Sequence, residues 1–108
     1  MSLDMCVYYK DGTHWDKPIA GFFTFDKYWF RPRKVLRLQY VPEMESGTLT
    51  IKRKRDVELI LKEFERLKEY HLKRGLLPVQ MDATRIDEMI EVCHKLLDEW
   101  ETIDHVSF

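Results

Sequence analysis

Glycine, proline and cysteine are all scarce in this chain of 108 residues, with four, four and two copies. So little glycine and proline excludes a collagen-like or low-complexity disordered chain. The two cysteines, Cys6 and Cys93, lie at opposite ends of the sequence, which is neither a disulfide framework nor a zinc-binding pattern. Since 44% of the residues are hydrophobic and 34% charged, we expect residues 1–108 to form a single globular domain with two free thiols.

Long apolar runs are also missing. The longest are a few residues, as in 19–23, whereas a helix needs about 20 to cross a bilayer. The N-terminus lacks the basic region and apolar core of a secretory signal. We therefore expect no membrane association and a cytoplasmic location.

Motifs for catalysis and for cofactors are absent too. The sequence has no glycine-rich phosphate loop and no Gly-x-Ser-x-Gly turn. Glu91 and His94 have the Glu-x-x-His spacing of carboxylate-bridged metal sites, but the second such pair that these sites need is lacking. We expect no catalytic residue, no metal and no cofactor. The enzyme alternative that stays open is a loop site around His14, Trp15 and Asp16.

Charge is distributed unevenly along the chain, although the formal net charge is only −1. Residues 1–55 contain 11 Lys/Arg against 6 Asp/Glu, a balance of +5, and residues 56–108 contain 7 against 13, a balance of −6. The near-zero total argues against indiscriminate binding to nucleic acid or anionic lipid, which needs a net basic surface. The chain is nevertheless an electrical dipole along its sequence, with the positive excess in the first half.

The first half of the chain has the two-residue periodicity of strands. The patterns predict strands over 5–10, 19–25, 33–40 and 48–52, with a tight turn at Asp11-Gly12 after the first. In the third, Leu36, Leu38 and Tyr40 alternate with polar residues, which is typical of a half-buried antiparallel strand that forms a hairpin with the fourth.

The periodicity changes to that of helices after Lys52. Apolar residues recur at three- and four-residue steps over 56–74 and again from Asp82 or Thr84 to Trp100, and Gly75 is well placed to end the first helix. The tail 103–108 is predicted either to add a last strand or to fold back on the core. We therefore predict an α+β fold, with an antiparallel sheet of about four strands from the N-terminal half and two C-terminal helices packed on one of its faces.

The segment 26–34, between the second and third predicted strands, is the strongest candidate for a contact surface. It combines Tyr28, Trp29 and Phe30 with Arg31 and Arg33. Three adjacent aromatic rings cannot all face inward, so we expect at least one to be accessible. Trp, Tyr and Arg dominate binding hot spots because they combine a large area with few torsions.

Two functional hypotheses follow. The first is a small intracellular protein-binding or regulatory domain without catalytic activity, which contacts a protein partner or a second copy through 26–34 and Arg37. Additional apolar residues off the helical stripes favour self-association; they are Leu59, Leu72, Leu76 and Leu77. The alternative is a module for single-stranded nucleic acid, in which Arg33, Arg37 and nearby aromatics form an open, basic sheet face.

Overall fold

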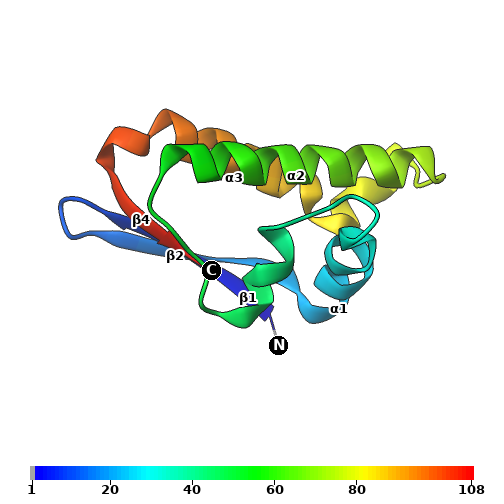
Figure 1. The fold of residues 1–108 in the computed structure, drawn as a ribbon, viewed down its shortest axis with the longest axis horizontal. Helices are drawn as coiled ribbons and strands as arrows, with labels where there is room; N and C mark the ends of the chain where they lie inside the picture. Colours follow the sequence, from blue (N-terminus) through cyan, green and yellow to red (C-terminus); the bar gives the residue numbers. More distant parts are fainter. Residues whose placement is uncertain (1) are drawn as a thin grey trace.

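The computed structural model describes residues 2–108 and shows one antiparallel sheet with helices placed between its strands (Figure 1). The strands are β1 (Ser2–Tyr9), β2 (His14–Gly21), β3 (Thr50–Ile51) and β4 (Ile103–Ser107), and their order in the sheet is β2-β1-β4-β3. The predicted α+β class is confirmed. The sheet is not built from the N-terminal half alone, however, because β4 comes from the C-terminal tail and lies between β1 and β3.

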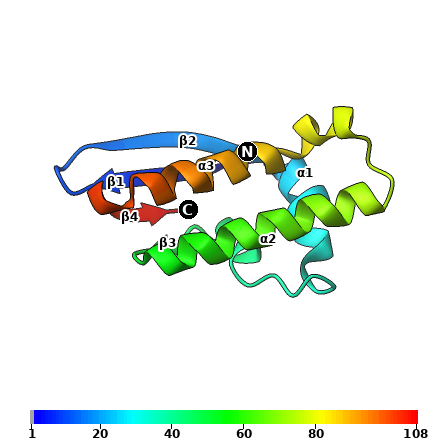
Figure 2. The ribbon, with the colours of Figure 1, turned by 90° about the horizontal axis from the view of Figure 1, so that it is seen from above.

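Two long helices, α2 (Lys54–Lys73) and α3 (Ile86–Asp98), lie side by side across one face of this sheet (Figures 1 and 2). Their apolar stripes have helical spacing and face the sheet, as predicted. Gly75 follows α2 with a φ of 98°, a conformation that glycine adopts without the steric cost of a Cβ atom. At the start of α3, the Thr84 hydroxyl accepts a hydrogen bond from the Ile86 amide.

The second strand begins earlier than predicted, at His14 instead of residue 19, and ends at Gly21. The turn at Asp11-Gly12 decides this, because the strands pair from Tyr8 and His14 onward, directly beside it. From Phe22 the backbone is helical, so the prediction of a strand over 19–25 is wrong beyond Gly21. Phe25 and Trp29 are both buried and lie four residues apart, which is the spacing of one helical face.

The predicted strand over 33–40 does not form. Arg33 ends a short helix, and the residues after it lie in turns and bends. The predicted hairpin between this segment and the next strand is therefore absent, and β3 pairs with β4 instead. Alternation of Leu36, Leu38 and Tyr40 was a misleading signal, since Leu38 alone of the three is buried.

Shorter helical elements fill the connections. They are α1 (Phe22–Thr24), the π-helix η1 (Phe25–Phe30) and the 3-10 helices η2 (Arg31–Arg33), η3 (Val41–Ser46), η4 (Pro78–Thr84) and η5 (Trp100–Thr102). The segment 22–46 packs against one end of the sheet and against α2, as Figure 2 shows. None of the helices formed by residues 2–108 combines the length and apolar composition that crossing a bilayer requires.

Candidate functional site

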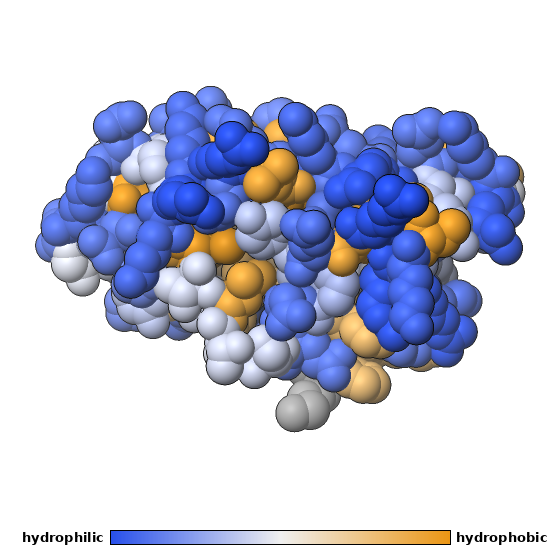
Figure 3. All heavy atoms as spheres, viewed as in Figure 1, coloured by the Kyte–Doolittle hydropathy of each residue, from blue (hydrophilic) through white to orange (hydrophobic). Residues whose placement is uncertain are grey.

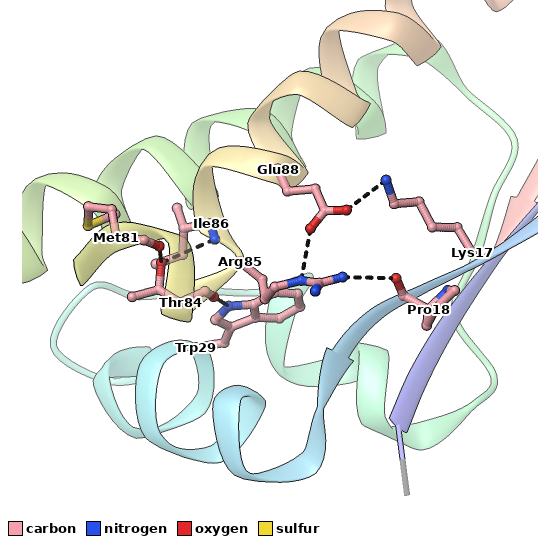
Figure 4. A network of polar contacts seen from close by, with 8 residues as sticks. All are labelled: Lys17, Pro18, Trp29, Met81, Thr84, Arg85, Ile86 and Glu88. Carbon is pink, nitrogen blue, oxygen red and sulfur yellow. Dashed lines mark hydrogen bonds and ion pairs between the residues drawn. The ribbon is translucent and has the colours of Figure 1, made fainter. Parts of the chain in front are cut away.

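Trp29, at the centre of the predicted contact segment, is buried in the core. None of its surface is exposed, and its indole lies edge-on to the rings of Phe25 and Phe64, with centroids 5.9 and 5.0 Å away. Its Nε1 donates a hydrogen bond to the carbonyl of Thr84 at 2.8 Å (Figure 4). Trp29 therefore presents no surface to a partner in this structure, and the accessible parts of the segment are its other residues.

Tyr28 and Phe30, on either side of Trp29, are half-buried, and cationic side chains cover their rings. The Arg33 guanidinium lies 3.7 Å from the centroid of the Phe30 ring, and Lys27 Nζ lies 5.2 Å from that of Tyr28. Cation–π contacts of this kind stabilise a charge while leaving its outer side open to solvent. The aromatic rings thus hold cations at the surface rather than offering their own faces.

These cations belong to a larger group, which we call the basic surface. Its members are Lys27, Arg31, Arg33, Lys34 and Arg37 from the segment before β3, and Lys62 and Arg66 from α2. Arg66 joins the two parts, because its Nη1 donates to the Leu36 carbonyl at 2.8 Å. Within the part of the chain that the structure describes, only Arg31 of this group forms an ion pair with a carboxylate, that of Asp26 at 3.0 Å.

Figure 3 looks onto α2 and the segment before it, from the viewpoint of Figure 1. Hydrophilic side chains dominate this face, and hydrophobic surface appears only as small separate patches between them. A partner that docks here meets charge first, with little apolar area to bury.

A pocket of about 500 Å³ opens at this surface, between α2 and the bend at 37–40. Its walls include Arg37, Lys62 and Arg66, with Leu59 and the Tyr40 ring as the apolar part. Arg37 is exposed and has a φ of 55°, in the left-handed region that side-chain-bearing residues rarely adopt. Such strained residues are concentrated at functional sites, where the surrounding structure holds them in place.

Three carboxylates also line the pocket, so its walls carry both signs of charge. Two of them are already engaged: Glu63 accepts hydrogen bonds from backbone amides, and Glu69 pairs with Lys73 at 2.6 Å. Glu65 and the three cations of the lining have no ion-pair partner among residues 2–108. The lining contains no cysteine, histidine or serine.

Beneath the pocket, the hydroxyl of Tyr40 donates a hydrogen bond of 2.7 Å to Asp56, and Arg53 donates to the same carboxylate from Nε and Nη2 at 3.2 Å. The Tyr40 hydrogen bond and the Arg53 charge hold the pKa of Asp56 below its usual value despite the burial of this side chain. The same contact with Asp56 raises the pKa of Tyr40. Tyr40 is therefore a neutral donor at physiological pH, and its ring is fixed as a wall of the pocket.

A second polar network fixes the other side of the segment (Figure 4). The Arg85 guanidinium lies 2.8 Å from Glu88 Oε2 and donates to the Pro18 carbonyl at 3.4 Å, and Lys17 Nζ pairs with the same carboxylate at 2.7 Å. These contacts tie the edge strand β2 to the start of α3. Because Trp29 bonds to Thr84 beside this network, η1 is anchored to the end of η4, just before α3, as well as to the core.

The face of the sheet that α2 and α3 leave uncovered differs from the predicted basic one. Arg33 and Arg37 are not on the sheet at all. The face presents a row of three rings, in which Tyr8 stacks on His14 at 5.7 Å and on His105 at 4.4 Å. The Tyr8 ring thus stacks on two imidazoles from the neighbouring strands, and the arginines of the predicted basic face lie elsewhere.

His14, Trp15 and Asp16 were considered as a loop site, but they lie in β2. The Trp15 indole is half-buried and donates from Nε1 to the Tyr9 hydroxyl at 2.7 Å, while His14 lies in the ring row. Among residues 2–108, no group of three histidine, cysteine, aspartate or glutamate side chains is close enough together to hold a metal ion.

Exposed apolar residues occur mainly at the connection between α2 and α3 and at the end of β2. Leu77 and Val79 are 56% and 82% exposed, and Leu72 lies at the border of exposure with 36%. Of the other two leucines that suggested self-association, Leu59 is half-buried in the pocket wall and Leu76 is packed against the core. Just after β2, Phe23 of α1 is 70% exposed.

Sequence analysis missed three residues of this site: Lys62, Glu63 and Arg66. Lys62 and Arg66 were ordinary exposed positions in the helical pattern, and nothing in the sequence indicates which loop faces them. Glu63 did carry a signal, because it lies three residues after Ile60 and four before Leu67, on the buried side of α2.

Comparison with protein-family models, with curated proteins and with solved structures finds no match.

Proposed function

We propose that this protein is a non-catalytic binding domain that docks an acidic segment of a partner protein on its basic surface. The observation that carries the proposal is the set of three cations, Arg37, Lys62 and Arg66, that line one pocket without carboxylate partners in the described chain. Lys27, Arg33 and Lys34, in the segment that leads to Arg37, add three more cations without such partners. Like charges on one surface repel one another and lower stability. An acidic partner relieves that repulsion, which supports electrostatic complementarity as the basis of recognition.

The aromatic residues contribute by restricting the cations. Arg33 is held on the Phe30 ring and also donates to the Phe30 carbonyl at 3.0 Å, so less side-chain entropy is lost when it binds a carboxylate. Arginine prefers planar, two-pronged contacts with carboxylates. Arg37 and Arg66, on opposite sides of the pocket mouth, are suited to such contacts with one or two acidic side chains.

Two other functions receive less support. Binding of single-stranded nucleic acid to the free face of the sheet is less supported, because Arg33 and Arg37, which that hypothesis assumed, do not lie on the sheet. Self-association has only small, separate groups of exposed apolar residues to use: Leu72, Leu77 and Val79 between α2 and α3, Phe22 and Phe23 after β2, and Val35. A salt-insensitive dimer that dissociates on substitution of Leu77 would favour self-association over the basic surface.

Fluorescence titration with a short labelled peptide of alternating glutamate and tyrosine tests the proposal. Replacing Arg37 by Gln is expected to weaken binding about fivefold, since exposed interfacial charges contribute on the order of 1 kcal/mol. Raising the salt from about 0.05 to about 0.15 M should weaken binding further, because it screens exposed charges.

Lys10→Gln is the matched control, because Lys10 is an exposed cation in the β1–β2 turn, away from the basic surface. It is expected to change affinity less than about twofold. Equal losses in the two variants would mean that the peptide responds to net charge alone, and the proposal would then be wrong. If the protein binds a single-stranded oligothymidylate more tightly than the peptide, and Arg37→Gln does not change that affinity, nucleic acid would be the better candidate ligand.

A further inference from the structure

Glu63 is a buried carboxylate without a cationic partner. It lies on α2, its residue surface is 2% exposed, and within residues 2–108 it belongs to no ion pair. Its two oxygens accept hydrogen bonds from three consecutive backbone amides: Gln39 at 2.9 Å, Tyr40 at 3.0 and 3.1 Å, and Val41 at 3.0 Å. A buried charge of this kind is strongly unfavourable unless its hydrogen bonds are satisfied.

Three successive amides that converge on one anion form the type of concave site by which proteins bind phosphate and other oxyanions. Here the chain fills such a site with its own side chain. Gln39 and Tyr40 lie in a bend, and Val41 is the first residue of η3, so no helix or strand supplies acceptors for these amides. The Glu63 carboxylate therefore accepts the hydrogen bonds that backbone carbonyls accept in a helix or a sheet.

Arg37 comes two residues before this amide site, at the end of a turn in which the Arg37 amide donates to the Lys34 carbonyl at 3.2 Å and the Leu38 amide to the Arg33 carbonyl at 2.9 Å. Its left-handed φ of 55° costs roughly 1 kcal/mol or more for a residue with a side chain. The hydrogen bonds of the local turn offset part of this cost. Two contacts from α2 hold the chain on either side of Arg37: Arg66 donates to the Leu36 carbonyl at 2.8 Å, and Glu63 binds the amides from Gln39 onward. Both anchors come from α2, one helical turn apart.

We infer that Glu63 is a positioning residue for the basic surface: by binding the amides of 39–41, it fixes the bend that presents Arg37 at the pocket. The amide site is thus a carboxylate-binding site that is occupied by a side chain of the same protein, Glu63. The role of Arg37 in this inference rests on the proposed function, whereas the amide site itself does not.

Amide hydrogen exchange followed by NMR tests the anchor without any partner. In the unaltered protein, the amides of Gln39, Tyr40 and Val41 should be protected although no helix or strand pairs them. In Glu63→Ala they should exchange at least about tenfold faster, and added formate, a small carboxylate that fits the vacated place, should slow them again.

Glu65→Gln is the matched control, since Glu65 is an exposed neighbour on the same helix with no hydrogen bond to the bend in the described chain. It should leave all three amides unchanged. Rapid exchange of these amides in the unaltered protein would overturn the inference, and so would equal exchange in Glu63→Ala and Glu65→Gln. If Glu63→Ala does not fold, Glu63→Gln is measured in its place. Because Gln keeps one acceptor oxygen, the three amides should exchange faster than in the unaltered protein, but by a smaller factor than that expected for Glu63→Ala.

A double-mutant cycle with the glutamate-tyrosine peptide separates positioning from a general loss of stability. Glu63→Ala is expected to weaken binding about fivefold in the unaltered background and less than about twofold when Arg37 is already Ala. Equal losses in both backgrounds would show that Glu63 acts independently of Arg37, against the inference. If Arg37→Ala alone leaves the affinity unchanged, the proposed function fails, and the exchange experiment still decides whether Glu63 anchors the bend.

Discussion

At the scale of single residues, buried carboxylates organise the segment that carries the candidate site. Glu63 binds the backbone of the bend, and Asp56, about two turns before it and 8% exposed, binds the Tyr40 hydroxyl and Arg53. Tyr40 is thus held at both ends, by its amide on Glu63 and by its hydroxyl on Asp56. Each carboxylate depends on these hydrogen-bond donors. If a donor is removed, the buried carboxylate loses a hydrogen bond and its desolvation is no longer compensated.

Tyr40→Phe tests this arrangement through the pH dependence of stability. The hydrogen bond lowers the pKa of Asp56 in the folded state below its ordinary value of 3.8, so its contribution is present above that value and disappears as the pH falls through the folded pKa. The substitution should therefore cost about 1 to 2 kcal/mol at pH near 7 and less at pH near 2.

Urea unfolding at the two pH values measures the difference. Tyr70→Phe is the control, because the Tyr70 hydroxyl has no hydrogen bond within residues 2–108. It should change stability little at either pH. A loss in Tyr40→Phe that is the same at both pH values would mean that the hydroxyl does not act through Asp56.

At the scale of elements, α2 is the scaffold of the site. One side of it packs its apolar stripe into the core, and the adjoining side carries Lys62, Glu63 and Arg66, which hold or face the bend. The bend has no regular backbone pairing and includes the strained Arg37. Under the proposed function, stability and binding therefore make opposite demands at position 37.

Arg37→Gly is expected to stabilise the fold by up to about 1 kcal/mol, because glycine adopts a φ of 55° without a Cβ clash, while it weakens peptide binding. Arg85→Gly is the matched comparison, since Arg85 has a φ of 61° but its side chain contacts Glu88 and Pro18. There the lost contacts offset the relieved strain. Thermal unfolding of both variants measures the difference, and destabilisation by Arg37→Gly would show that its backbone is not strained.

At the scale of the whole molecule, the sheet joins the two ends of the chain. β1 pairs with β4 near the C-terminus, with Val7 opposite Val106, so the core closes only when the last strand is in place. Cys6 of β1 is partly exposed, whereas Cys93 of α3 is packed under the helical pair. The two thiols therefore report on the surface and on the closed core respectively.

Thiol modification at mildly alkaline pH should distinguish them. Burial raises the pKa of Cys93 to about 12, so this thiol should react only when the protein unfolds. Cys6 should react in the folded state, more slowly than a free thiol because burial and Asp16 also raise its pKa. Cys6→Ser should abolish the early phase, and simultaneous reaction of both thiols in the unaltered protein would contradict the closed core.

The sequence alone was enough for the elements whose periodicity is local. Helices near 54–73 and 86–98, the first strand, the turn at Asp11-Gly12 and the stop at Gly75 were all predictable, because apolar spacing and glycine act within a few residues. The basic and aromatic character of 26–37 was also visible in the sequence.

Only the tertiary structure decided how that segment is used. The alternation of Leu36, Leu38 and Tyr40 predicts a strand, but Glu63, more than twenty residues later, takes up the amides with which a strand would pair. Trp29 lies in the core because Phe64 and the Thr84 carbonyl surround it, and neither is near it in sequence. The local pattern determined which residues were available, and long-range hydrogen bonds and packing determined which of them face solvent, since these contacts outweigh a weak strand preference.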